Sequence, residues 1–542
     1  MSTRDATKPT AALPLKQNPT LQATPSFAPS GLPRRTFLRG AASVCALAAV
    51  SNSTPLQARS TSAAAVAVKD SDEIIFMSAT KLAALLRSRK LSAREVVDAY
   101  IGRQIAIDDR LNAVVMTCYA RARDEATVLD QRAKRGDFAG ALHGVPMTIK
   151  DSFDTEGVIS TGGTYGRQQY VPKKDAAVVA RLRSQGAILL GKSNTPEFTL
   201  GGVGGINTTG NMLHGSTHNP YDLTRTTSGS SGGAGANVAA GGAAFDIGSD
   251  IGGSLRLPAH MTGTAALKTT AGRVPRTGHI VDYGGVLDSW QQLGPLARRV
   301  QDLALLAPII SGPDFRDAAC APVPWADPAA VDLAKLRVAF YPQNGLSKVH
   351  EDVQRTVSQA ASWLGEIAAS VNQDCPTALI QDLHKARGQL AMGDGWAWYQ
   401  RLAKKWGTNH LSPTMAEAVT AAKPISSSAF AEAAEKADET KSRLLSWFAK
   451  YDVLICPVAE NAATLIDWDP AIVSDWSGVL SDVGTFNSTG WPVAVVRCGT
   501  SADGGMPIGV QIVAAPWRED IALAVARYLE GRSGGWVPPS IV

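Results

Sequence analysis

Helical periodicity dominates the chain from about residue 75 onward. Leucines recur at three- and four-residue intervals within residues 79–89, and Ser78 stands directly before them as a candidate N-cap. Ser92 and Glu95 fit a capping box, so a second helix is expected from there through Ile101. Further helices are predicted over residues 119–135, 176–184 and 520–530, and residues 347–450 are predicted to be mostly helical.

Short apolar runs between these helices predict buried strands. They cover residues 145–149, 187–190, 453–458, 493–496 and 509–513. Because helices and strands alternate and no internal repeat is found, the pattern predicts the α/β class. Several prolines within residues 315–335 predict a surface loop.

Residues 201–264 depart from this pattern, because Gly, Ser, Thr and Asn replace large side chains there. Such a composition is usual in linkers. Yet residues 236–245 have a small-residue helical pattern, and the run D-I-G-G-S-L-R follows at 250–256. Since small residues let backbones approach closely, we interpret this region as a packed active site built largely from main chain.

The net charge of +5 is concentrated at the start of the chain. Residues 1–60 contain seven basic side chains and one acidic side chain, which leaves about −1 for the remainder. No basic stripe with interleaved aromatic residues is present in the sequence, so no nucleic-acid partner is expected.

Residues 1–60 resemble a twin-arginine signal peptide. Arg34 and Arg35 precede T-F-L-R, and the mildly apolar run 41–50 is far shorter than the ~20 residues needed to span a bilayer. The resemblance implies recognition by the twin-arginine export machinery, cleavage near Ala58 or Ala64, and a periplasmic or secreted protein without stable membrane insertion.

Cysteine and histidine usage predicts neither a disulfide framework nor a metal site. The six cysteines are scattered without a C-x-x-C pair, and Cys45 lies in the leader. His214 and His218 come nearest to a ligand spacing, but they lie in a Gly/Asn-rich loop without a nearby acidic partner.

Three short motifs match catalytic patterns but lack the context that each requires. Residues 186–193 match the P-loop pattern, yet the four middle residues are themselves the predicted strand. Residues 229–233 match G-x-S-x-G, but no strand is predicted before them, as a nucleophile elbow requires. Residues 78–81 match S-x-x-K, where Ser78 is better explained as a helix cap.

Lys150, Ser230 and Ser254 together indicate nucleophilic catalysis. Lys150 follows the predicted strand 145–149, where an apolar environment would lower its pKa and supply a neutral amine as base. Ser230 and Ser231 are flanked by glycines, and the glycine-rich turn before Ser254 can direct successive amides at an anion, as an oxyanion hole requires. Alone, Lys150 fits a surface lysine and each serine fits a turn residue, so the combination carries the argument.

The stretch from Thr227 to Arg256 resembles the amidase signature, a G-S-S-G-G element followed by D-I-G-G-S-L-R. The resemblance extends over about residues 75–530. It includes L-H-G-V-P-M-T-I-K-D at 142–151, G-K-S-N at 191–194, N-P-Y-D at 219–222, and the tail from G-W-P to P-I-G-V-Q at 490–511.

This resemblance implies a role for each residue of the site. Ser254 matches the nucleophile, Ser230 the proton relay held by a cis peptide bond, and Lys150 the base. The implied oxyanion hole consists of the backbone amides of Ile251, Gly252, Gly253 and Ser254. The implied supporting residues are Ser231, Asp250 and Arg256.

The family fold implied by the resemblance is one large α/β/α domain around a mixed β-sheet. We therefore expect residues 61–542 to form a single amidase domain that needs no metal or organic cofactor. The sequence departs from the family pattern at Thr227, Thr269 and Arg497, where proline is common, and none of these changes removes a catalytic group.

The implied reaction is hydrolysis of a carbon–nitrogen bond in a small-molecule or peptide amide through an acyl-enzyme on Ser254. Esterase activity at the same site is an alternative, as is a non-catalytic binding protein on this fold. A tRNA-dependent amidotransferase subunit is a further alternative, against which the export leader argues.

The sequence leaves the substrate and the oligomeric state open, with a homodimer among the alternatives. One aromatic cluster could line an acyl pocket, although packing between helices explains it better. Its members are Trp396, Trp398, Tyr399 and Trp406.

Overall fold

An eleven-stranded mixed sheet organises the chain, with strand order β1-β3-β2-β8-β10-β9-β14-β15-β13-β11-β12. The structure, a computed structural model, describes residues 73–200, 208–281, 285–466 and 476–541, with the backbone alone at 286 and 476–481. The strands are β1 (Val114–Thr117), β2 (Pro146–Lys150), β3 (Ile188–Ser193), β8 (Phe245–Asp250), β9 (Ala265–Lys268), β10 (Gln292–Ala297), β11 (Arg337–Phe340), β12 (Ser370–Gln373), β13 (Val453–Pro457), β14 (Val493–Thr500) and β15 (Pro507–Ala514).

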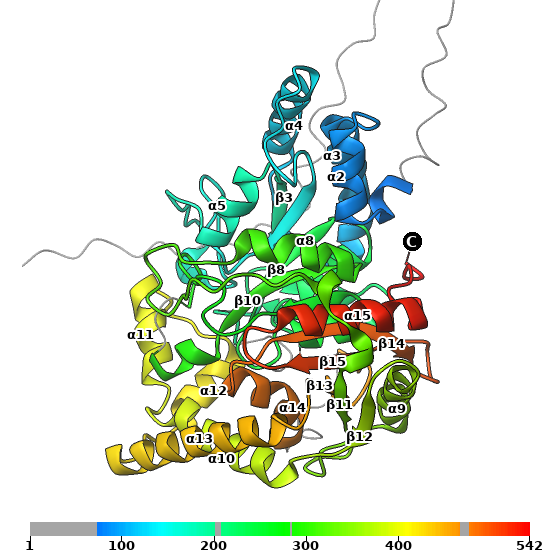
Figure 1. The fold of residues 1–542 in the computed structure, drawn as a ribbon. Coiled ribbons are helices and arrows are strands. Elements are labelled where there is room, and N and C mark those ends of the chain that lie inside the picture. The colour runs from blue at the N-terminus through cyan, green and yellow to red at the C-terminus, as the bar shows by residue number, and fades with distance from the viewer. Residues whose placement is uncertain (1–72, 201–207, 282–284, 467–475, 542) are drawn as a thin grey trace, which may run out of the picture. The chain divides into compact units, whose positions relative to one another are not determined.

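Helices cover both faces of the sheet, which gives the expected large α/β domain (Figure 1). They are α2 (Ala79–Arg87), α3 (Ala93–Leu111), α4 (Tyr119–Lys134), α5 (Ala177–Ser184), α6 (Gly232–Ala239), α7 (Arg256–Thr262), α8 (Val300–Ile310), α9 (Glu351–Gly365), α10 (Thr377–Met392), α11 (Ala397–Trp406), α12 (Pro413–Ala421), α13 (Ser427–Phe448), α14 (Trp476–Ser488) and α15 (Glu519–Ser533).

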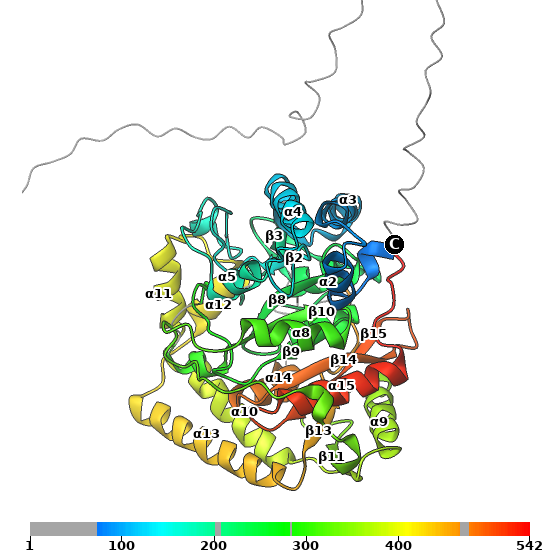
Figure 2. The ribbon, with the colours of Figure 1, turned by 45° about the horizontal axis from the view of Figure 1, so that its top comes forward.

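Alternate residues of the central strands separate the core into two layers, because successive side chains of a strand point to opposite faces. On β14, Ala494 and Val496 pack into the largest hydrophobic cluster, which includes residues of α8 and α15. Val493 packs instead with α10, α13 and α14, and Val495 packs with α6 and α7. Helices α10 and α13 run side by side in both views (Figure 2).

The sheet topology brings the ends of two strands together. β2 pairs with β3 and with β8 in parallel, in a register that places Met147 opposite Phe245. Because the carboxyl ends of parallel strands meet at the same edge, Lys150 at the end of β2 lies beside Ser249 and Asp250 at the end of β8.

Most predicted elements are confirmed with small shifts at their ends. Ser78 caps α2 by accepting from the amide of Lys81, and the capping box of Ser92 and Glu95 begins α3. The predicted strands correspond to β2, β3, β13, β14 and β15, and the predicted helices 119–135, 176–184 and 520–530 correspond to α4, α5 and α15. Residues 347–450 are mostly helical, with β12 inserted, and 315–335 form an irregular, largely exposed segment.

The helix predicted over residues 236–245 is wrong in its start, its end and its length. The observed helix α6 ends at Ala239, and Phe245 instead begins strand β8, which the sequence pattern did not predict. Gly, Asp and Ser have low strand propensity, so β8 is held by its neighbours β2 and β10 rather than by local preference.

The next two observations concern the predicted leader and membrane-spanning helices. The predicted leader, residues 1–60, lies outside the described residues. Within the described ranges, none of the helices has the length and apolar character that a bilayer crossing would require.

Candidate active site

Lys150 is buried at the end of β2 and contacts two serine hydroxyls. Its Nζ donates to Oγ of Ser230 at 2.7 Å and to Oγ of Ser249 at 2.9 Å, and the lysine has no exposed surface. Burial lowers the pKa of Lys150 from 10.5 to about 7, although Asp250 and Asp246 act in the opposite direction. A lysine in this state can carry a neutral amine near neutral pH, as the sequence analysis expected.

Ser230 and Ser254 are brought together by a main-chain hydrogen bond. The amide of Ser231 donates to the carbonyl of Ser254 at 3.0 Å, so the peptide after Ser230 lies against the predicted nucleophile. The Gly229–Ser230 peptide bond is cis, as the resemblance implied. The loop around Ser230 therefore connects the buried lysine to the turn that carries Ser254.

Glycines make this close approach of segments feasible. A Cβ at Gly248 on β8 would lie 2.6 Å from Oγ of Ser231, and one at Gly233 would lie 2.3 Å from the amide nitrogen of Asn194. Both distances are shorter than any ordinary contact, so larger residues would force the start of α6 away from the sheet. The small-residue composition of this region thus reflects packing, as predicted.

Asp250 organises the turn that presents Ser254. Its carboxylate accepts from the amides of Gly253 at 2.8 Å, Leu255 at 3.1 Å and Arg256 at 3.2 Å. Burial alone would raise the pKa of Asp250, but the charge and hydrogen bonds of Arg256 hold it well below its usual range. The carboxylate is therefore ionised, and the backbone amides of the turn point toward it.

The amide of Gly253 is occupied by this arrangement. It donates to Asp250, so it does not converge with the other predicted oxyanion donors in this structure. The backbone at Gly253 has φ +100°, and a Cβ there would lie 2.9 Å from side-chain atoms of Leu257 and Val483. The glycine is required by conformation and space, and the expected donor set is reduced to Ile251, Gly252 and Ser254.

Arg256 joins the turn to distant parts of the chain. Its guanidinium donates to both carboxylate oxygens of Asp250, at 3.0 and 2.9 Å, and to side-chain oxygens of Gln511 and Asn487 at 2.6 Å each. Both members of the Arg256–Asp250 ion pair are fully buried. Losing either Arg256 or Asp250 would leave the other as an uncompensated buried charge, so we expect removal of one partner to destabilise the fold strongly.

Sequence reasoning missed several residues that hold the site. Ser249 contacts the lysine directly, and Asn487 donates through Nδ2 to Oδ1 of Asp250 at 2.8 Å. Arg387 on α10 donates to the carbonyl of Ile251 at 2.6 Å. Ser249 adjoins the signature run, which could have drawn attention to it, whereas nothing local marks the other two.

The aromatic cluster packs helix α11 against its surroundings. The rings of Trp396 and Trp398 contact Tyr399 with centroids 6.1 and 5.8 Å apart, and Tyr399 meets Phe198 at 5.5 Å. Arg167 stacks over Trp406 at 4.4 Å from the ring centroid. These contacts support the packing interpretation of the cluster.

The P-loop-like and G-x-S-x-G-like motifs, which the sequence analysis rejected, lie in ordinary secondary structure. One detail differs from the prediction. Residues 188–193 are strand β3, so no phosphate-binding loop is formed there. A short strand, β7 (Asp222–Thr226), does precede residues 229–233, contrary to the sequence prediction, but it belongs to a separate two-stranded sheet with β6 (His218–Asn219). Among the described residues, no three His, Cys, Asp or Glu side chains are grouped as metal ligands, and the five described cysteines are free thiols.

The amino-acid sequence is similar to a known family model and to curated relatives. A model of the family described as Amidase matches residues 95–523. Indoleacetamide hydrolase of Bradyrhizobium diazoefficiens is 33% identical over 84% of this chain and 86% of its own length. A subunit of the glutamyl-tRNA(Gln) amidotransferase of Oleidesulfovibrio alaskensis is 34% identical over 85% of this chain and 98% of its own length.

A solved structure agrees with these sequence relatives. That of 6-aminohexanoate cyclic dimer hydrolase complexed with substrate superposes with a TM-score of 0.75 at 30% identity, covering 86% of this chain and 99% of the hydrolase. The fold and the sequence therefore point to the same family.

Proposed function

The chain belongs to the amidase signature family and is a hydrolase of carbon–nitrogen amide bonds, and from this premise we propose that Ser254, Ser230 and Lys150 carry out the reaction in an exported enzyme. The observation that carries the proposal is the buried Nζ of Lys150 at 2.7 Å from Oγ of Ser230. The peptide after Ser230 is in turn hydrogen-bonded to Ser254.

In the proposed mechanism, neutral Lys150 accepts the hydroxyl proton of Ser230 while Ser230 accepts that of Ser254. The Ser254 oxygen attacks the amide carbonyl, and the amides of Ile251, Gly252 and Ser254 stabilise the oxyanion. As the carbon–nitrogen bond breaks, Ser230 passes its proton to the leaving amine and recovers one from Lys150, which becomes neutral again. Water hydrolyses the acyl-enzyme by the same proton route and regenerates the serine.

The nucleophile is tested by Ser254→Ala. We expect turnover to fall by at least about 10⁴-fold while the far-ultraviolet circular dichroism is unchanged, because the covalent route is removed but the turn is held by Asp250. A fluorophosphonate probe should label wild-type Ser254, as located by mass spectrometry, and should not label the variant. Labelling of Ser231 or Ser78 instead would contradict the assignment, and no labelling would favour a binding protein.

The proposed substrate is a small-molecule or peptide amide, in keeping with the amide hydrolases among the relatives. Since the same machinery can cleave esters, matched amide and ester pairs should be assayed together. An amidotransferase subunit is the closest alternative, because several relatives at 32–34% identity carry that name. The predicted leader argues for export instead.

Export is tested by fractionating cells that express the full chain. The wild type should be recovered outside the cytoplasm, and a variant with Arg34→Lys and Arg35→Lys should be retained inside. Cytoplasmic recovery of both would contradict export without affecting the assignment of the serines.

A further inference from the structure

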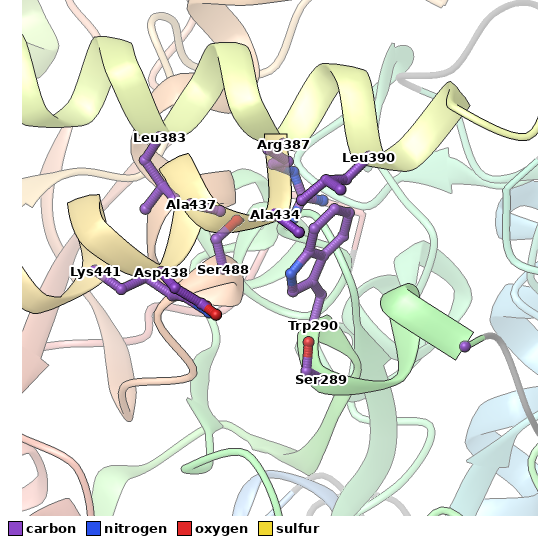
Figure 3. Close-up of a pocket in the computed structure, with 11 residues that line it drawn as sticks. Ser289, Trp290, Leu383, Arg387, Leu390, Ala434, Ala437, Asp438, Lys441 and Ser488 are labelled. Carbon is purple, nitrogen blue, oxygen red and sulfur yellow. Dashed lines mark hydrogen bonds and ion pairs between the residues drawn. The ribbon is translucent and has the colours of Figure 1, made fainter. Parts of the chain in front are cut away.

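A cavity of about 210 Å³ lies between η2 (Gly285–Trp290), α10, α13 and the end of α14 (Figure 3). Apolar side chains form part of its wall, and the lining also contains five polar or charged residues, of which Ser289 is one. The lining used in the argument is Trp290, Leu383, Arg387, Asp438, Lys441 and Ser488.

Arg387 connects the cavity to the turn that carries Ser254. Nη2 of Arg387 donates to the carbonyl of Ile251 at 2.6 Å, and a Cβ at Gly252 would lie 3.3 Å from the same atom. The carbonyl of Trp290 accepts from Asn487, which also donates to Asp250. Arg387 therefore both lines the cavity and contacts the main chain of the turn that leads to Ser254.

The charges around the cavity do not balance. Asp438 is paired with Lys441, whose Nζ lies 2.5 Å away, and Figure 3 shows both on α13, away from Arg387. Arg387 donates to the Ile251 carbonyl and, at 3.3 Å, to Oγ of Ser488, both neutral acceptors. Within the described parts of the chain, no carboxylate lies within ion-pair distance of its guanidinium.

The surroundings of Arg387 disfavour the charged form of its side chain. Burial and the positive charge of Arg256 lower the pKa of Arg387 from 12.5 to about 10, while the carboxylate of Asp250 acts in the opposite direction. Asp250 already forms its ion pair with Arg256. Arg387 is half-buried and still carries its charge at neutral pH, so an anion bound in the cavity would pair with a cation for which no carboxylate partner is found among the described residues.

The guanidinium of Arg387 retains donors for a further ligand. It lies over Trp290, with its Cζ 4.5 Å from the ring centroid, and makes hydrogen bonds to the Ile251 carbonyl and to Oγ of Ser488. Because a guanidinium has five N–H groups in a planar fork, it can also bind a carboxylate through two hydrogen bonds.

We propose that Arg387 is a specificity-determining residue that binds a carboxylate of the substrate, so that the enzyme acts on amides bearing a carboxylate next to the scissile bond. This inference rests on the proposed hydrolase function. The carboxylate can belong to the acyl portion or to the amine portion, and the test separates the two.

The experiment compares substrates that differ only in this charge. Glutaric acid mono-p-nitroanilide is paired with pentanoic acid p-nitroanilide for the acyl side, and N-benzoyl-β-alanine with N-benzoylpropylamine for the amine side. Wild type should prefer the charged member of at least one pair. Arg387→Gln keeps a donor for the Ile251 carbonyl but removes the charge, and it should lower kcat/KM for that member by about 10- to 100-fold, mainly through KM.

Matched variants separate charge from structure. Arg387→Lys should keep part of the preference, and Arg443→Met, which removes an exposed cation of α13 outside the cavity, should leave it unchanged. In Arg387→Gln, kcat/KM for the neutral member of the pair should fall by a clearly smaller factor than kcat/KM for the charged member. Equal losses on both members of a pair, or no preference by wild type in either pair, would overturn the proposal.

Failure of the hydrolase assignment can be distinguished from failure of this inference. Fluorophosphonate labelling of Ser254 at the wild-type rate in Arg387→Gln would show that the catalytic turn is intact. Binding of glutarate to the intact protein, measured by calorimetry, should be lost in Arg387→Gln whether or not Ser254 is labelled. Equal glutarate binding by wild type and Arg387→Gln would contradict the carboxylate site itself.

Discussion

Two lysines at the ends of adjacent strands are both buried, yet they serve different parts of the molecule. Lys150 ends β2, and Lys192 lies near the end of β3. The parallel register pairs Lys150 with Ser193 and Ile149 with Lys192, so the two lysine side chains point to opposite faces of the sheet. Burial lowers the pKa of Lys150 to about 7 and that of Lys192 to about 8.

Their partners differ in kind. Lys150 contacts the hydroxyls of two serines, one of which adjoins the predicted nucleophile. Lys192 donates to the carbonyl of Phe153 and to the hydroxyls of Thr155 and Ser160, which fix the loop after β2. A lowered pKa therefore does not identify a catalytic lysine by itself, because desolvation acts on both, and the groups within reach decide the role.

The comparison is tested most strongly by Lys150→Met. We expect kcat to fall by about 10³-fold or more, because Lys150 is the group hydrogen-bonded to the hydroxyl of Ser230 and the described residues offer no second base bonded to it. Kinetics on a reactive amide measure the loss, and thermal unfolding should show that the folded state is kept. Activity of Lys150→Met within tenfold of wild type would contradict a catalytic role for Lys150 and leave it no different in kind from Lys192.

The pH dependence of turnover gives the next largest effect. If the neutral amine of Lys150 is the base, as proposed, its pKa of about 7 means that the rate should fall as pH drops through 7. At pH 5 it should be about 100-fold below its plateau, which follows from one proton per lysine. Circular dichroism over the same range controls for unfolding. A flat profile from pH 5 to 9 would contradict a lysine base.

Lys192→Met should act on stability rather than on chemistry. Removing this side chain takes a donor from three buried acceptors and a cation from the vicinity of Asp151, so we expect a loss of about 3 kcal/mol in the free energy of unfolding. The measurement is the urea midpoint. The protein that remains folded should keep turnover within about tenfold. An unchanged midpoint with lost turnover would place Lys192 in the chemistry.

Elements with local sequence signals were predicted, whereas elements held by distant parts of the chain were not. The start of helix α3 was predicted correctly because its capping box uses residues three positions apart, although the helix continues beyond Ile101 to Leu111. Strand β8 was not predicted, because its residues favour turns and only pairing with β2 and β10 extends them.

By itself, the sequence determined the chemical groups of the site, the glycines that allow its close packing, and the elements whose signals are local. The tertiary structure decided which lysine faces the serines, how Gly253 is engaged, and that Ser249, Asn487 and Arg387 complete the site. The physical reason is distance along the chain. Lys150 meets Ser230 across 80 residues, Asp250 meets Asn487 across 237, and Ile251 meets Arg387 across 136. Burial and pairing at such separations are properties of the whole fold, which no local pattern encodes.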